Sequence, residues 1–162
     1  MDVTDPRGQA DSLRTWNSGK IIMCDGRLVA IRRRRWAAPA SIARVWFQTR
    51  LKAGNHDECV LDYRSSRIGG FMVLDYIRSG PGTRFATIRG ACQILDEIAK
   101  QRQAVAIFAH VSTDAISDRL LRRWGWEPHA NNMTGRHWIK RFYDGYPVVN
   151  LDQYVSQLSG RQ

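Results

Sequence analysis

The chain has 162 residues, 43% of them hydrophobic, which is enough apolar material for one globular domain with a packed core. No apolar run approaches a membrane span, and the N-terminus lacks the charged-then-apolar order of a signal peptide, so a cytoplasmic protein is expected. The net charge of +10, supplied mainly by arginine, favours anionic partners such as nucleic acid, phosphorylated cofactors or acidic proteins.

The first third of the chain is expected to hold an arm, a hairpin and a helix. Residues 1–17 are polar and of mixed charge, which is typical of a disordered arm. Two apolar runs then flank Asp25 and Gly26, a pair that favours a tight turn, and so predict a β-hairpin. Between Pro39 and Gly54 the apolar residues recur at helical spacing, which predicts a helix.

The middle of the chain predicts strands on either side of a long helix. The runs ECVLDYR (58–64) and FMVLDYIR (71–78) predict an antiparallel strand pair. Apolar residues at three- and four-residue steps over 88–103 predict an amphipathic helix. The continuous apolar run AVAIFAHV (104–111) predicts a strand buried on both faces, parallel to the strand before the helix.

A second helix and a last strand follow. The stretch STDAISDRLLRRWGW (112–126) predicts a helix that Ser112, Thr113 or Asp114 caps and Gly125 terminates. The run RHWIKRFY (136–143) predicts the closing strand.

The whole pattern is that of one α/β domain. We expect a central mixed sheet of about six strands flanked by three to four helices, with the domain over 18–150 and a short tail over 151–162.

The element order from Phe71 to Tyr143 resembles that of the GNAT superfamily of acyl-CoA N-acyltransferases. In that family a helix N-terminus after a glycine-bearing loop binds the CoA pyrophosphate with its backbone N–H groups. The next strand diverges from its neighbour and leaves a wedge for the pantetheine. A further helix often closes in a tyrosine-containing turn followed by Gly-Phe. In LLRRWGW, Gly125 and Trp126 stand in the place of that Gly-Phe.

Two positions depart from the family's pattern. The pyrophosphate-loop pattern, [QR]-x-x-G-x-[GA], corresponds here to TIRGAC, in which Gly90 matches while Thr87 and Cys92 replace the other two residues. The family's usual general acid is a tyrosine four residues before the glycine of the turn, and Leu121 stands there. Because leucine cannot donate a proton, another group or water must do so, or the protein does not transfer acyl groups.

The resemblance implies acetyl-CoA or another acyl-CoA as co-substrate and an amine as acceptor, whose identity stays open. Loop amides over 82–90 would hold the pyrophosphate, with arginines supplying positive charge, and strand backbone would pair with the pantetheine. The residues placed at the co-substrate in this way are Gly82, Thr83, Arg84, Thr87, Arg89, Gly90, Ala109 and Val111.

Two side chains are candidates for the base that deprotonates the amine. His110 ends the apolar strand and is the natural candidate because histidine is the side chain most often used as a base at neutral pH, although a strand-end histidine bonded to backbone is the alternative. Asp75 interrupts an apolar run, where it would act as base or orient one unless alternation turns it to solvent. His129 and His137 could reach the substrate from the last hairpin or be ordinary surface residues.

No metal site is expected. Cys24, Cys59 and Cys92 lie far apart, without the spacing of a zinc site, and are expected to be buried reduced thiols.

A second function remains open. Arg32 to Arg35 continue a strand as a solvated run or as a phosphate contact. A second basic region interleaves arginines with Trp124, Trp126 and Trp138, which would either stack on single-stranded nucleic acid or fill the core. The alternative to an enzyme is therefore a catalytically degenerate domain of the same fold that binds RNA or an acidic partner protein through an Arg/Trp surface.

Overall fold

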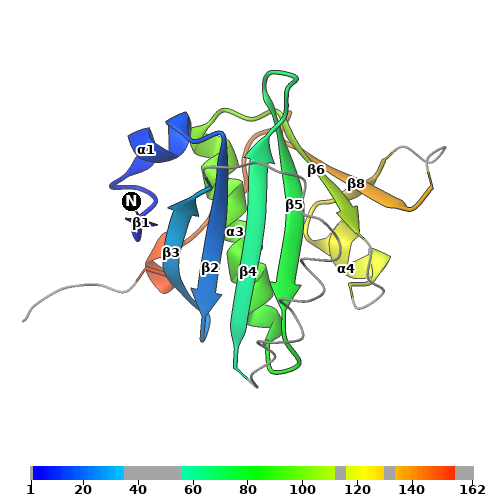
Figure 1. The fold of residues 1–162 in the computed structure, drawn as a ribbon. Coiled ribbons are helices and arrows are strands. Elements are labelled where there is room, and N and C mark those ends of the chain that lie inside the picture. The colour runs from blue at the N-terminus through cyan, green and yellow to red at the C-terminus, as the bar shows by residue number, and fades with distance from the viewer. Residues whose placement is uncertain (1, 35–55, 112–115, 130–133, 156–162) are drawn as a thin grey trace, which may run out of the picture.

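The computed structural model describes residues 2–34, 56–111, 116–129 and 134–155 (Figure 1). The helix predicted between Pro39 and Gly54 lies outside the described residues. The elements are β1 (Asp2–Val3), α1 (Ala10–Thr15), β2 (Ser18–Cys24), β3 (Arg27–Arg33), β4 (Glu58–Ser65), β5 (Phe71–Ser79), α3 (Phe85–Gln101), β6 (Ala106–Val111), α4 (Asp118–Arg123), β7 (Glu127–Pro128), β8 (Arg136–Arg141) and the 3-10 turn η1 (Leu151–Gln153).

The described strands form one mixed sheet of eight strands in the order β1-β3-β2-β4-β5-β6-β8-β7. Among the described strands β5 and β6 are the parallel pair, and the other neighbours are antiparallel. The predicted fold class is therefore confirmed. The two strands beyond the expected six, β1 and β7, are two residues long, too short to show an alternating pattern.

The β2–β3 hairpin turns at the predicted residues. Asp25 and Gly26 have φ angles of 51° and 75°, the left-handed backbone that a two-residue hairpin turn requires at both positions.

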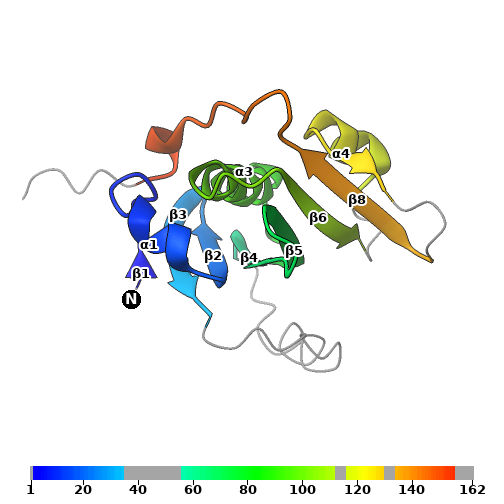
Figure 2. The same ribbon diagram turned by 90° about the horizontal axis from the view of Figure 1, so that it is seen from above.

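Helix α3 covers one face of the sheet and organises the core (Figure 2). Its buried Ile94, Leu95 and Ile98 belong to one cluster with strand residues such as Leu61 and Ile107. Each such side chain contributes about 1.5–3 kcal/mol when fully buried. Among the described helices none combines the length and apolarity needed to cross a membrane.

The N-terminal segment, expected to be a disordered arm, is folded. β1 pairs with β3, and Val3, Leu13 and Trp16 are at most 3% exposed. The Arg102 guanidinium at the end of α3 donates to three backbone carbonyl oxygens between Leu13 and Trp16, at 2.5–2.9 Å. The apolar residues of this segment are too widely spaced to form a pattern, so the sequence did not reveal their burial.

The domain also extends past the expected boundary at residue 150. Leu151 and Tyr154 are 1% and 8% exposed and belong to the core. The backbone N–H of Leu28 donates to the carbonyl oxygen of Tyr154 at 2.9 Å, which ties the C-terminal segment to β3.

Helix α4 is shorter than predicted. Its N-cap is Ser117, whose hydroxyl accepts from the N–H of Leu120 at 3.3 Å, in place of the expected Ser112, Thr113 or Asp114. Those three residues lie outside the described part of the chain. The C-terminal stop at Gly125 is as predicted, with φ +83°.

Candidate functional site

The parallel strands β5 and β6 separate part of the way along their length. They pair from Phe71 and Ala106 to Leu74 and Ala109, whereas β5 continues to Ser79 and β6 to Val111. Figure 1 shows the two strands diverging toward the end at which α3 begins. Beyond the last pair, the facing strand edges have no partner among the described strands. Backbone N–H and C=O groups there are free to pair with an extended ligand.

A bulge in β5 coincides with the point of separation. Tyr63 pairs with Leu74 and Asp62 with Tyr76, so Asp75 is an extra residue without a counterpart on β4. A bulge of this kind bends the strand and redirects a side chain. Asp75 is thus the first residue of β5 beyond its pairing with β6.

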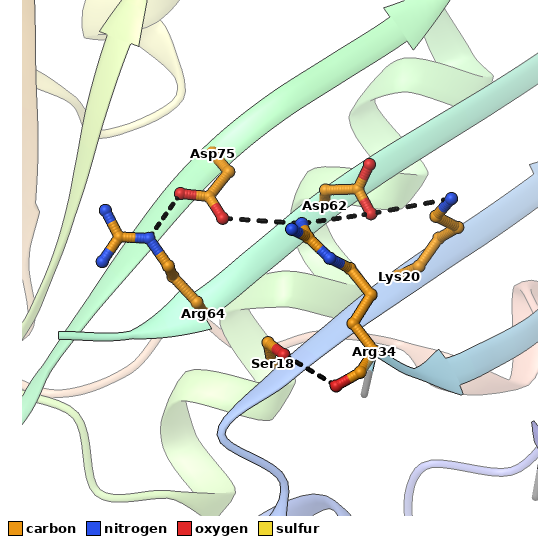
Figure 3. Close-up of polar contacts among 6 residues, drawn as sticks. All are labelled: Ser18, Lys20, Arg34, Asp62, Arg64 and Asp75. Atoms are coloured by element: carbon orange, nitrogen blue, oxygen red, sulfur yellow. Dashed lines mark hydrogen bonds and ion pairs between the residues drawn. The ribbon is translucent and has the colours of Figure 1, made fainter. Parts of the chain in front are cut away.

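Asp75 lies in a row of alternating charges on the sheet face opposite α3 (Figure 3). Its carboxylate accepts from Nε of Arg64 at 2.7 Å and lies 3.6 Å from Nη1 of Arg34. The same Arg34 nitrogen is 3.6 Å from Oδ1 of Asp62, which also lies 3.9 Å from Nζ of Lys20. Two guanidinium groups therefore balance the charge of Asp75, a reason to regard it as an orienting group and not as the base.

Burial changes the proton affinity of the second carboxylate in this row. Burial raises the pKa of Asp62 above its ordinary value and outweighs the cations Lys20, Arg34 and Arg78, which act to lower it. The nearby Asp75 charge adds to the increase.

His110 is exposed at the end of β6, yet its ring is held in place. The ring stacks on that of His137, its cross-strand neighbour, with centroids 4.6 Å apart and planes inclined by 27°. Gly135 has φ +103°, and a Cβ built there would lie 2.8 Å from Nε2 of His110. Nε2 of His137 lies 3.0 Å from the carbonyl oxygen of Thr134. The imidazole is thus both accessible and oriented, as a general base requires.

The structure brings the two candidate bases to the same face of the sheet. Val73 and Phe108 are register partners on the face away from α3. Two residues further along each strand come Asp75 and His110, at the point where the strands diverge. His129 lies against Phe108, with the two ring centroids 5.3 Å apart, and its backbone N–H donates to the carbonyl oxygen of His137.

An internal carboxylate occupies the N-terminus of α3. Asp57 accepts from the backbone N–H of Arg84 at 2.8 Å, from Nε of Arg84 at 2.6 Å and from the hydroxyl of Thr87 at 2.8 Å. Burial acts to raise the pKa of Asp57, but the hydrogen bonds from Arg84 and Thr87 together hold it below its ordinary value. Arg84 and Thr87, both expected at the co-substrate, are engaged by Asp57 instead.

The other residues expected at the co-substrate mainly make contacts within the fold or lie inside α3. Gly82 is half-buried in the turn before α3. The hydroxyl of Thr83 donates to the carbonyl oxygen of Glu58 at 2.7 Å and accepts from the N–H of Gly80 at 2.9 Å. α3 already begins at Phe85, so Thr87, Arg89 and Gly90 lie within the helix rather than in a loop.

Gly90 and Arg89 face away from β6. A Cβ at Gly90 would lie 2.8 Å from Met23 and 2.9 Å from Tyr154, so glycine is required there for close packing. Arg89 is exposed and borders a surface cavity of about 340 Å³. The cavity's other lining residues are Gly26, Ala86, Gln93, Gln153 and Tyr154. Figure 2 shows the C-terminal segment and β6 on opposite sides of α3.

The structure also places the two candidate residues of β6 and the position of the family's general acid. Ala109 is buried at the last pair with β5, and Val111 packs against the core beyond it. Leu121, in the place of the family's tyrosine, is 5% exposed and belongs to the core.

The tryptophans that the structure describes do not form a stacking surface. Trp16, Trp126 and Trp138 are at most 4% exposed, and Trp124 packs against the core. The expected Arg/Trp surface therefore presents its arginines without those rings.

The thiols are free. Cys59 and Cys92 are buried and Cys24 is half-buried. Burial raises the pKa of Cys59 to about 12, with a smaller contribution from the nearby carboxylates of Asp57 and Glu58.

Two residues of this region escaped the sequence analysis. Arg64 had a detectable signal, because Asp62 and Arg64 alternate with apolar residues along β4 and so share one face. Asp57 had none, since its partners are about thirty residues away in the sequence.

Comparisons with known proteins add little to this geometry. No protein-family model and no curated protein matches the sequence. Among solved structures, the crystal structure of nourseothricin acetyltransferase aligns with a TM-score of 0.43 and 11% sequence identity, covering 83% of this chain and 93% of that one. A similarity of this size does not establish a shared family or a shared activity.

Proposed function

We propose that this chain is an acyl-CoA-dependent N-acyltransferase that moves an acetyl or related group from CoA to an amine. The observation that carries the proposal is the separation of the parallel strands β5 and β6 beyond Leu74 and Ala109. An oriented histidine stands at the edge of this separation, and the N-terminus of α3 lies at the same end of the sheet (Figure 1). This is the arrangement that the element order of the sequence led us to expect.

The described residues fit an acyl-CoA in two places. The open edges of β5 and β6, including Ala109 and Val111, offer backbone groups to the amides of a pantetheine. At the start of α3, the N–H groups of Phe85 and Ala86 have no hydrogen-bond partner among the described residues and are typical donors to a phosphate. The Asp57 carboxylate opposes this second contact, because it brings a negative charge to the same helix end.

Acyl-CoA supplies the activated thioester, and His110 supplies the base. In the proposal, its imidazole takes the proton from the acceptor's ammonium group and so generates the nucleophilic amine. His137 and Gly135 hold the ring in position. Asp75 holds Arg64 and does not accept the proton.

No tyrosine is required at position 121. A thiol has an ordinary pKa of about 8.5, so a thiolate leaves readily near neutral pH and takes its proton from water. This assignment accommodates the buried Leu121.

The second candidate is a domain of this fold that binds nucleic acid or an acidic protein without catalysis. Two observations favour it: Asp57 occupies the helix end where a phosphate would bind, and α4 exposes Arg119, Arg122 and Arg123. Binding of RNA to such a surface would weaken steeply with salt.

A thermal-shift titration with acetyl-CoA separates the two candidates. A ligand at one hundred times its dissociation constant adds about 2.7 kcal/mol of stability, which gives a clear rise in melting temperature. We expect acetyl-CoA to produce this rise, and ADP and mixed short RNA to produce little. The variant Asp57→Asn should bind acetyl-CoA more tightly, and His110→Ala should bind it equally while losing transfer. The proposal is contradicted if only RNA raises the melting temperature, or if none of the three ligands raises it.

A further inference from the structure

The sheet face opposite α3 carries an arginine whose hydrogen-bonding capacity is only partly used. Nε of Arg64 is fixed by Asp75 at 2.7 Å, and its side chain is 39% exposed. Figure 3 shows the two terminal nitrogens pointing away from Asp75 and from the rest of the charge row. No bond to these nitrogens is found among the described residues. The guanidinium is therefore held in place while its outer edge stays available.

Arg64 lies on the same face of the sheet as His110, the base of the proposed function. Arg64 is the register partner of Val73, and Val73 is the partner of Phe108. Neighbouring strands lie about 4.8 Å apart, so an extended arginine on β4 reaches across β5 toward β6. Asp75 and His110 follow on the same face, two residues beyond Val73 and Phe108.

Aromatic rings cover the adjoining part of this face. The rings of Phe71 and Phe108 have centroids 5.4 Å apart, and those of Phe108 and His129 are 5.3 Å apart. All three residues are partly exposed. We name the side chains of Arg64, Phe71, Phe108, His110 and His129 the acceptor face.

We infer that the acceptor is a small amine that carries both an anionic group and an aromatic ring. The inference rests on the proposed function and gives the substrate class of the same site. Arg64 pairs with the anion through its terminal nitrogens, the rings of Phe71 and Phe108 contact the aromatic body, and His110 faces the amine.

The chemistry of each residue type supports this assignment. The planar guanidinium matches a carboxylate or phosphate with two parallel hydrogen bonds, and Asp75 has already fixed its orientation. Aromatic side chains prefer to pack against rings in offset or tilted arrangements. The net charge of +10 attracts an anionic acceptor and repels a polyamine.

Four amines test the inference with acetyl-CoA as donor. L-Phenylalanine carries ring and carboxylate, its aminophosphonate analogue carries ring and phosphonate, phenethylamine lacks the anion, and L-alanine lacks the ring. We expect KM for at least one of the two anionic aromatic amines to be tenfold or more below those of phenethylamine and alanine. Whichever of the two has the lower KM identifies the anion as carboxylate or phosphate. Equal KM values for all four amines overturn the inference.

Variants of the acceptor face test which residues cause the difference in KM. Arg64→Gln should raise KM for the anionic aromatic amines tenfold or more and leave that of phenethylamine unchanged, and Arg64→Lys should restore only part of the loss. Arg67→Gln, an exposed arginine in the following turn, is the matched control and should change neither value. Phe108→Leu should raise KM for phenylalanine but not for alanine. If Arg64→Gln has no greater effect than Arg67→Gln, Arg64 does not bind the acceptor.

A binding measurement separates this inference from the proposed function. Phenylalanine and its phosphonate analogue, added to the protein with CoA, should shift the NMR signals of the His110 and His129 rings, and Arg64→Gln should weaken this binding. Such binding without any acyl transfer refutes the proposed function and keeps the anion subsite. Transfer to phenethylamine and phenylalanine with equal KM keeps the enzyme and refutes the subsite. Melting curves of each variant show whether it is folded.

Discussion

Gly125 shows how a single residue determines where an element ends. Its N–H donates to the carbonyl oxygen of Arg122, and the N–H of Trp126 donates to that of Leu121, both at 3.0 Å. This pair of hydrogen bonds requires a residue with left-handed backbone conformation, and Gly125 has φ +83°. We predict that Gly125→Ala lowers the free energy of unfolding by about 1–2 kcal/mol, measured by urea denaturation. Gly69→Ala is the control, because a Cβ there meets nothing within 4 Å, and an equal loss in both variants would contradict the prediction.

Asp57 stabilises the start of α3, and this contribution to stability should depend on pH. Its pKa lies below the ordinary 3.8 in the folded chain, so its contribution to stability is complete above 3.8 and is lost as the pH falls through the lower folded value. Asp57→Asn should therefore cost about 1 kcal/mol at neutral pH, the value of a helix cap, and progressively less below pH 3.8. Denaturation curves of both proteins across this range test it. A difference that stays constant with pH would exclude a charge effect.

At the scale of elements, one buried ion pair joins α3 to β8. Nζ of Lys140 donates to Asp96 at 2.7 Å, and the two side chains are 9% and 6% exposed. Burial raises the pKa of Asp96, while Lys140 acts to lower it. Lys140→Met alone should cost about 3–5 kcal/mol, because it leaves a buried charge unpaired. Adding Asp96→Leu should recover most of that loss. The free energies of unfolding are measured by denaturant titration. If the double variant is no more stable than Lys140→Met alone, the ion pair itself stabilises the fold.

At the scale of the whole molecule, the two terminal segments complete the core. Leu13 is fully buried, although it belongs to the segment that the sequence indicated as a loose arm. Leu13→Ala should lower the free energy of unfolding by about 2–5 kcal/mol, as expected for a buried leucine. Arg7→Ala, whose side chain is 54% exposed, is the control in the same segment. A loss below 0.5 kcal/mol for Leu13→Ala would mean that the segment does not pack in solution.

The acceptor face is also a property of the whole molecule. Its side chains come from β4, β5, β6 and the residue after β7, and only the sheet order β4-β5-β6-β8-β7 brings them together. His110 and Asp75 could be identified from the sequence because a histidine at a strand end and a carboxylate in an apolar run are visible locally. The contact between Asp75 and Arg64 could not be predicted, because a cross-strand pair depends on register and on the bulge at Asp75.

The sequence alone determined the six longer strands, helix α3, the hairpin turn at Asp25 and Gly26 and the stop at Gly125. Each of these follows from the periodicity of apolar residues or from the backbone preference of a single residue, and both signals lie within a short stretch of sequence. Only the tertiary structure decided that residues 2–16 and Leu151 belong to the core, that Gly90 is a packing residue, and that Asp57 occupies the start of α3. The reason is physical: these outcomes depend on contacts between residues far apart in the chain, and such contacts leave no periodic signal in the segments that make them.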